Sequence, residues 1–174
     1  MNDRLYWVWA QSALGISRSV KTDEIISYFG DAKTLYFAGE YEWRISGIFT
    51  RGQLNNITAT PLEKAEKIVS DCDRCGVKIV TPGDGNYPSM LFKLPNLPLV
   101  LYVRGDLDCL KNKISIAVVG ARKGSDIGRR IARALSASLC RSGAMIVSGA
   151  AEGIDSAAHR GALDVGAKTV AVLG

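Results

Sequence analysis

The residues from Ile116 to Arg130 read "IAVVGARKGSDIGRR" and combine the residue types that bind an anion. An apolar run ends at Gly120, glycines recur at 124 and 128, and the basic pair Arg122 and Lys123 lies between the first two. The glycines allow the backbone to approach a partner closely, and the pair supplies positive charge at the start of the expected helix. Unpaired backbone amides at such a helix start can receive a phosphate. We therefore predict an anion-binding loop at this position.

A second loop of the same kind follows the next apolar run, in "SGAAEGIDSAAH". It contains Ser148, Gly149 and Gly153 before another expected helix. Ligands of open α/β sheets bind outside the carboxyl ends of the strands, so both loops are predicted to contribute to one site. Asp155 is predicted to be the N-cap of the second helix, and His159 a structural histidine with a local partner.

The loop spacing does not match the common nucleotide-binding motifs. The glycines follow GxxxGxxxG rather than GxGxxG, no acidic residue ends the next strand, and the Walker pattern is missing. No cofactor and no catalytic residue are therefore predicted. One enzymatic alternative stays open: Glu152 and Asp155, three residues apart, could act on the N-glycosidic bond of a nucleoside monophosphate. Such enzymes carry a PGGxGT-type loop, which this sequence lacks.

No metal site is predicted from the cysteines. Cys72 and Cys75 form a CxxC pair, but the chain has only four cysteines in all and a single histidine. A closed zinc site needs four ligands, usually from two such pairs or from added histidines. The interpretation is that the cysteines are reduced, as in a cytoplasmic protein.

Short helices are predicted throughout residues 1–75. Thr22 is the predicted N-cap of an early helix that ends at a glycine. In "TPLEKAEKIVSDCDRCG", Thr60 is the predicted N-cap, Pro61 the first helical residue and Glu63 the partner in a capping box. These patterns predict a small all-helical domain.

The pattern changes after Gly76, which places a domain boundary between residues 75 and 76. Short strands are predicted in "VKIVT" and "LVLYVRG", and strands and helices alternate from Lys113 onward. The runs are continuously apolar, as expected for a parallel sheet covered on both faces by helices. The predicted fold class is therefore α/β, with a helical domain at 1–75 and a sheet domain at 76–174. Five segments after residue 112 carry this pattern: strands in "ISIAVVG", "AMIVSG" and "KTVAVLG", and helices over 127–141 and 156–165.

Charge is distributed unevenly along the chain. The net charge is +5, but residues 1–75 contain nine Lys/Arg and ten Asp/Glu, whereas residues 76–174 contain thirteen and seven. The second part would attract a polyanion. No apolar run approaches the roughly 20 residues of a transmembrane helix, so no membrane span is predicted.

Four segments together resemble the DNA-processing protein A (DprA, also called Smf) family: "YPSMLFKLPNLPLVLYVRGD", "VVGARKGSDIGRRIARAL", "VSGAAEGIDSAAHRGAL" and "KTVAVLG". The resemblance implies a SAM-like, helix-hairpin-helix-related domain followed by an extended Rossmann-like domain. It also implies that the protein binds and protects single-stranded DNA and loads the RecA recombinase onto it during natural transformation. The family is cytoplasmic, homodimeric and not regarded as enzymatic.

The resemblance assigns the nucleic-acid-binding residues. The family's Gly-Ser-Arg loop corresponds to Gly120, Ala121 and Arg122, next to Lys123, so one hydroxyl is replaced by a methyl group. The second segment corresponds to Ser148, Gly149 and Gly153.

The chain is expected to be an amino-terminal fragment of such a protein. In the family, the sheet continues past the strand in "KTVAVLG", and further basic pocket residues and the dimer interface lie in that later part. We therefore expect weakened DNA binding by this chain and self-association through uncovered apolar surface.

Overall fold

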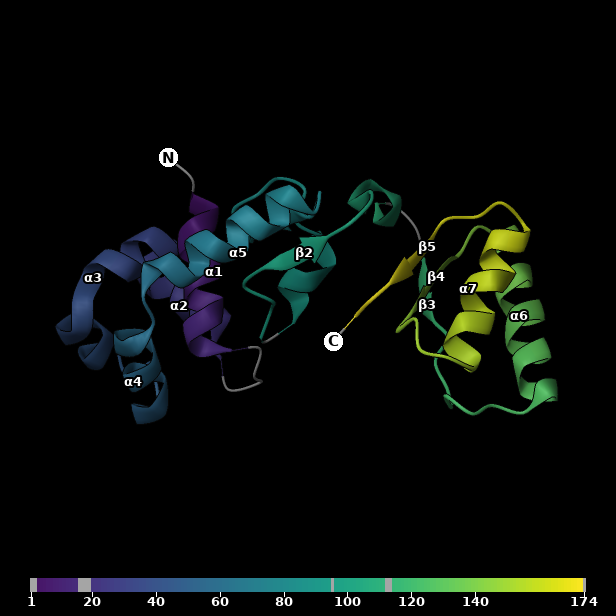
Figure 1. Cartoon of the computed structure of the whole chain (residues 1–174), viewed down its shortest axis with the longest axis horizontal. Coiled ribbons are helices and arrows are strands. Elements are labelled where there is room, and N and C mark those ends of the chain that lie inside the picture. The colour runs from purple at the N-terminus through teal and green to yellow at the C-terminus, as the bar shows by residue number, and fades with distance from the viewer. Residues whose placement is uncertain (1–2, 16–19, 95, 112–113, 174) are drawn as a thin grey trace. The chain divides into compact units, whose positions relative to one another are not determined.

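The computed structural model describes residues 3–15, 20–94, 96–111 and 114–173. The chain divides into two compact units, Met1–Leu107 and Asp108–Gly174 (Figure 1). This division lies further along the chain than the boundary predicted after residue 75, because Ile79, Leu99 and Val100 are buried in the core of the helical part. The boundary at 75/76 stays a prediction about where the family's second domain begins.

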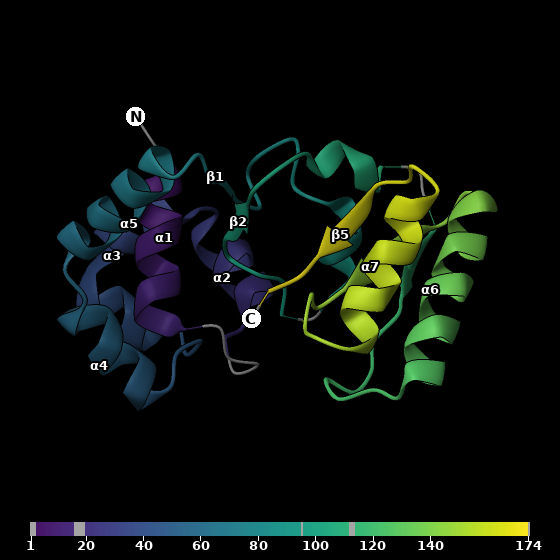
Figure 2. The same cartoon turned by 45° about the vertical axis from the view of Figure 1, so that its right-hand side comes forward.

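The first unit is built around its first helix. This helix, α1, contributes more residues to the unit's core than any other helix of the described chain, and both figures show other helices around it (Figure 2). Trp9 is 1% exposed, and its indole Nε1 donates to the carbonyl oxygen of Thr60 at 2.8 Å. The helices are α1 (Asp3–Leu14), α2 (Thr22–Phe29), α3 (Ala32–Ile45, with non-helical backbone at Gly39), α4 (Arg51–Ala59) and α5 (Leu62–Arg74).

Two of the predicted helix caps are wrong. Thr22 lies inside α2 and is 1% exposed, while Lys21 occupies the N-cap and its side chain makes no capping hydrogen bond. Thr60 ends α4 rather than beginning α5, and its hydroxyl donates to the carbonyl oxygen of Asn56 at 2.7 Å. The physical reason is that α4 and α5 follow one another almost directly, so the preceding helix already engages the Thr60 side chain. Pro61 is the N-cap of α5.

A capping box that the sequence analysis missed begins α4. The Thr50 hydroxyl accepts from the amide of Gln53 at 3.2 Å, and the Gln53 side chain accepts from the amide of Thr50 at 2.8 Å. We expect Thr50→Ala to lower the free energy of unfolding by about 1 kcal/mol, because it removes an N-cap acceptor. Thr60→Ala is the matched control and is expected to cost less, since its hydroxyl only bonds back within α4. Urea denaturation followed by tryptophan fluorescence measures both, and equal losses would contradict this assignment.

A small hairpin completes the first unit. Strands β1 (Lys78–Val80) and β2 (Leu101–Val103) pair antiparallel, so they do not belong to the parallel sheet. The connection between them contains the 3₁₀ helix η1 (Ser89–Lys93). The hydroxyl of Tyr87 donates to the carbonyl oxygen of Pro98 at 2.7 Å and so links the two ends of this connection. A second 3₁₀ helix, η2, covers Leu107–Leu110.

The second unit contains a three-stranded parallel sheet in the order β3-β4-β5. The strands are β3 (Ser115–Ala117), β4 (Met145–Ser148) and β5 (Thr169–Ala171), and they are connected by α6 (Asp126–Arg141) and α7 (Ile154–Asp164). Both helices lie on the same face of the sheet (Figures 1 and 2). Two successive right-handed crossovers in one direction place their helices on one side. The prediction of helices on both faces is therefore wrong for the described part of this unit.

Helix α6 packs through its small residues rather than through its predicted apolar stripe. Ala132, Ser136 and Ala137 are buried, whereas Ile127, Ile131 and Leu135 are 63%, 60% and 49% exposed. The small residues allow α6 and α7 to approach closely: a Cβ at Gly161 of α7 would overlap the carbonyl oxygen of Arg133. Leu139 is the one member of the stripe packed against the unit's core. Self-association through such uncovered surface stays a prediction.

Candidate nucleic-acid interface

The first loop, residues 118–125, leaves the end of β3 and presents a basic pair. Ala121, Arg122 and Lys123 are exposed. No ion pair joins either basic side chain to a carboxylate among residues 3–15, 20–94, 96–111 and 114–173. Helix α6 begins directly after the loop, where the hydroxyl of Ser125 accepts from the amide of Gly128 at 3.1 Å. We call residues 118–125 the 120 loop.

The second loop, residues 149–153, connects β4 to α7 and contacts the 120 loop directly. Its backbone is left-handed at Ala150, with φ 57°, and at Gly153, with φ 89°. The amide of Ile154 donates to the carbonyl oxygen of Ala121 at 3.3 Å, and a Cβ at Gly153 would overlap the carbonyl oxygens of Ala121 and Arg122. We call residues 149–153 the 150 loop. The structure therefore brings the two predicted loops together.

The glycines of the 120 loop make room for a side chain of the protein itself. The side chain of Ile154 fills the space beside them, since a Cβ would lie 2.8 Å from Ile154 Cβ at Gly120 and 3.0 Å from Ile154 Cδ1 at Gly124. Real Cβ atoms avoid such distances, so a larger residue at Gly120 would displace Ile154. These two glycines thus provide room for an internal side chain, and the close approach of a ligand to their backbone stays a prediction.

Asp155 does not cap α7, which corrects another prediction. The N-cap residue is Gly153, and Asp155 is the second helical residue. Its carboxylate is directed across to the 120 loop, where Oδ1 accepts from the amide of Gly120 at 3.1 Å. The residue is only 6% exposed. Helix α7 begins at Ile154, so Asp155 lies beyond the N-cap position, and the close contact between the loops places the amide of Gly120 within its reach.

The position of the Asp155 carboxylate also argues against the enzymatic alternative. That alternative needs Glu152 and Asp155 to act together on a glycosidic bond. Glu152 is exposed, while the Asp155 carboxylate is buried and occupied by a backbone amide. A general acid or base must reach the substrate proton, and Asp155 is directed into the protein instead.

Ser148 connects the ends of two strands. It is 3% exposed, and its hydroxyl donates to the carbonyl oxygen of Val118 at 2.7 Å. The proton of that hydroxyl is therefore not available to a phosphate. Ser148 fixes the point from which both loops leave the sheet.

Two of the four arginines on α6, Arg129 and Arg133, form ion pairs with carboxylates. Arg129 forms an ion pair with Asp126. Arg133 makes a bidentate contact with Asp164 of α7, with Arg133 Nη2 2.7 Å from Asp164 Oδ1. The hydrogen bond from Arg133 lowers the pKa of Asp164. Arg130 is exposed. Like the basic pair of the 120 loop, it is a candidate for phosphate contacts.

His159 has its partner on β5. Its Nδ1 lies 2.8 Å from the hydroxyl of Thr169, and that hydroxyl donates to the carbonyl oxygen of Ile146. Because the hydroxyl proton is used there, the neutral imidazole carries its proton on Nδ1 and donates it to Thr169. Burial lowers the pKa of His159, and the charge of Asp155 opposes that shift.

The lowered pKa of His159 predicts a loss of stability in mild acid. The unfolded chain takes up a proton near its ordinary pKa of about 6.5, whereas the folded chain takes it up only at lower pH. The contribution of neutral His159 to the free energy of unfolding is therefore complete above about pH 6.5, and it decreases as the pH falls toward the folded-state pKa. We expect the melting temperature of the wild type to fall more between about pH 7.5 and pH 5 than that of His159→Gln. Parallel profiles would contradict this assignment.

Within the described ranges, no group of three or more His, Cys, Asp or Glu side chains is arranged to hold a metal ion. In the same ranges, no helix is both long and apolar enough to span a bilayer. All four cysteines are free, and burial is the main cause that raises the pKa of Cys72.

Comparison with known proteins relates more than half of the chain to one family. The profile of the family described as DNA recombination-mediator protein A matches residues 78–174. Protein Smf of Synechocystis is 43% identical over 100 residues, which is 56% of this chain and 25% of the relative. The putative DNA processing protein DprA of Mycobacterium tuberculosis H37Rv is 35% identical over 142 residues, or 71% of this chain and 36% of the relative.

A solved structure extends the similarity to the first unit. The X-ray structure of DNA processing protein A (DprA) from Streptococcus pneumoniae aligns with 99% of this chain and 58% of its own length, at a TM-score of 0.73 and 26% identity. The chain thus spans between a quarter and about two fifths of the length of the curated relatives. Its profile match and its fold together show that the chain belongs to the DNA recombination-mediator protein A (DprA/Smf) family.

Proposed function

We propose that this chain provides a non-catalytic binding surface for single-stranded DNA in DNA processing. The observation that carries the proposal is the pair of contacting loops, which presents Arg122 and Lys123 without a carboxylate partner beside the start of α6. The second unit as a whole contains ten Lys/Arg and five Asp/Glu. Positive side chains and free helix amides give affinity for phosphate without reading the base sequence.

Different residues have different roles in this proposal. Arg122 and Lys123 contact phosphates through their side chains, and the backbone at Gly120 and Ala121 lies along the DNA strand. Gly149 and Gly153 shape the 150 loop. Asp155 positions the 120 loop through the amide of Gly120.

The family's further properties belong to the same proposal. They are loading of the RecA recombinase, homodimerisation and action during natural transformation. The names of the relatives, DNA processing protein DprA and Protein Smf, support a role in DNA processing. Base stacking is expected to contribute little from the second unit, because no aromatic residue follows Tyr102 in the chain.

Fluorescence anisotropy with labelled oligo-dT tests the proposal. The wild type is expected to bind with an affinity that falls steeply with salt, and a duplex competitor is expected to displace the oligonucleotide poorly. Arg122→Ala combined with Lys123→Ala should lower affinity about tenfold or more and reduce the salt slope by about 1.4, or 0.7 per phosphate contact.

Arg141→Ala is the matched control. Arg141 is exposed in the last turn of α6, at the opposite end of that helix from the 120 loop. Its replacement removes one positive charge, half of the change made by the double variant, and should leave the affinity within about twofold, as expected for an exposed charge outside the site. Equal losses from Arg141→Ala and the loop variants would show that net charge, rather than the loop, causes binding.

A further inference from the structure

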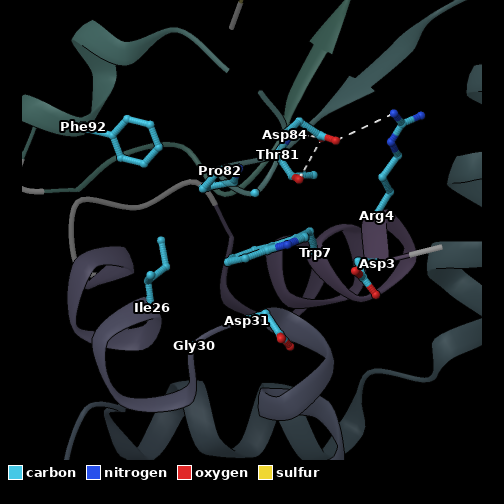
Figure 3. Close-up of a pocket in the computed structure, with 11 residues that line it drawn as sticks. Asp3, Arg4, Trp7, Ile26, Gly30, Asp31, Thr81, Pro82, Asp84 and Phe92 are labelled. Atoms are coloured by element: carbon cyan, nitrogen blue, oxygen red, sulfur yellow. Dashed lines mark hydrogen bonds and ion pairs between the residues drawn. The ribbon is translucent and has the colours of Figure 1, made fainter. Parts of the chain in front are cut away.

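A cavity of about 370 Å³ lies within the first unit, far along the chain from the 120 and 150 loops. It opens between α1, the end of α2 and the connection that follows β1 (Figure 3). Its volume lies within the range of sites for small organic ligands. The proposed DNA-binding function does not use it.

One end of the cavity is apolar. Trp7, Ile26, Pro82 and Phe92 line it, and Figure 3 shows Phe92 and Ile26 on one side of the Trp7 indole. Trp7 is 3% exposed, so its indole is fixed in the core, whereas Phe92 is 51% exposed. Such a wall accepts a flat or branched apolar group.

The other end is polar and carries an excess of negative charge. Asp3, Asp31 and Asp84 line the cavity together with a single cation, Arg4. Figure 3 shows Asp3 and Arg4 on the side of Trp7 away from Phe92.

Asp84 is largely engaged by its neighbours. Its Oδ2 accepts from the amide and hydroxyl of Thr81 at 2.8 and 2.9 Å, and Oδ1 lies 3.8 Å from Nη2 of Arg4. Asp31 caps α3 through one oxygen, Oδ1, which accepts from the amide of Thr34 at 2.7 Å. The Arg4 guanidinium is thus already paired, and Asp3 and Asp31 add two further negative charges to the lining.

We propose that this cavity binds a small organic cation, with its apolar body among Trp7, Ile26 and Phe92 and its amidinium, guanidinium or ammonium group toward Asp3 and Asp31. Carboxylates attract a cation, and the apolar wall accepts the body of the ligand. The same carboxylates repel phosphate, so the cavity does not fit a nucleotide or a DNA backbone. The ligand class thus differs from that of the 120 and 150 loops.

Benzamidine is the first probe, with benzamide and benzoate as a neutral and an anionic compound of nearly the same shape. Amide chemical shifts in a ¹H–¹⁵N spectrum measure binding site by site. Benzamidine is expected to shift the amides of Gly30, Gly83 and Asp84 at millimolar concentration. Benzamide should bind about tenfold more weakly, and benzoate should produce no shifts.

Variants separate the site from a general charge effect. Asp3→Asn combined with Asp31→Asn should weaken benzamidine binding about tenfold, and asparagine retains the cap of α3. Asp23→Asn is the control, because Asp23 is exposed on α2 and does not line the cavity. Unchanged circular dichroism verifies that the variants are folded. Equal binding of benzamide and benzamidine, equal effects of Asp23→Asn and the double variant, or no shifts with benzamidine would each overturn the proposal.

Discussion

Gly161→Ala is expected to lower the stability of the second unit by about 3 kcal/mol. Gly161 is buried on α7, and an added Cβ would overlap the carbonyl oxygen of Arg133 on α6. A backbone atom cannot turn aside as a flexible side chain can, so the two helices must separate. Separation would also weaken the bidentate contact between Arg133 and Asp164.

The two units allow this effect to be located. The three tryptophans, Trp7, Trp9 and Trp43, all belong to the first unit, so their fluorescence reports on that unit alone. Hydrogen exchange at the amides of Ile146 and Val147 in β4 reports on the second unit. We expect faster exchange there in Gly161→Ala, with little change in the urea midpoint of tryptophan fluorescence.

Gly52→Ala is the control for the substitution itself. Gly52 lies in α4, and a Cβ there would have no atom outside its own helix turn and chain neighbours within 4 Å. Alanine is expected to stabilise this helix by up to about 1 kcal/mol, because it restricts the unfolded chain and favours helix. If Gly161→Ala were equally neutral or stabilising, the close approach of α6 and α7 would be contradicted.

Asp155→Ala is expected to have the second largest effect, on stability and on DNA binding together. It removes a buried, charged acceptor from the amide of Gly120, which should cost about 2 kcal/mol. The 120 loop then loses a fixed contact with α7. We therefore expect weaker binding of oligo-dT, measured by anisotropy, although the substitution removes a negative charge.

Two further variants distinguish positioning from charge. Asp155→Asn keeps an acceptor oxygen for Gly120 and should recover part of the loss in both measurements. Asp164→Asn removes an exposed carboxylate from the same helix and should leave oligo-dT affinity equal or higher. If Asp155→Ala strengthened DNA binding as well, the side chain would act only through its charge, and the positioning role would be wrong.

The positions of most helices and strands could be predicted from the sequence. Apolar periodicity and glycine stops locate α5, α6 and β4 to within a few residues, and the parallel arrangement follows from the continuously apolar strands. The family resemblance predicts the α/β class and the order of the two parts, and the solved relative confirms the fold. These features depend on neighbours in the chain, which a sequence displays directly.

The features that the sequence did not predict depend on contacts between distant segments. Asp155 has the residue type and position of an N-cap, but its partner is an amide 35 residues earlier. Thr60 has the pattern of a cap, but α4 ends where α5 begins. The stripe of Ile127 and Ile131 has helical periodicity, but the close packing of α6 against α7 uses alanines and a glycine instead. In each case a tertiary contact outweighs a local preference.

The side chain of Ile154 has a consequence for the energetics of binding. It fills the space beside Gly120 and Gly124, while its amide bonds to Ala121. The 120 and 150 loops therefore share the Ile154 side chain and amide as a common support. On the proposed function, the backbone of both loops is already in contact before a ligand binds, so less conformational entropy is lost there on binding. If the proposed function holds, a short, glycine-rich segment binds DNA without a disordered state to be ordered first.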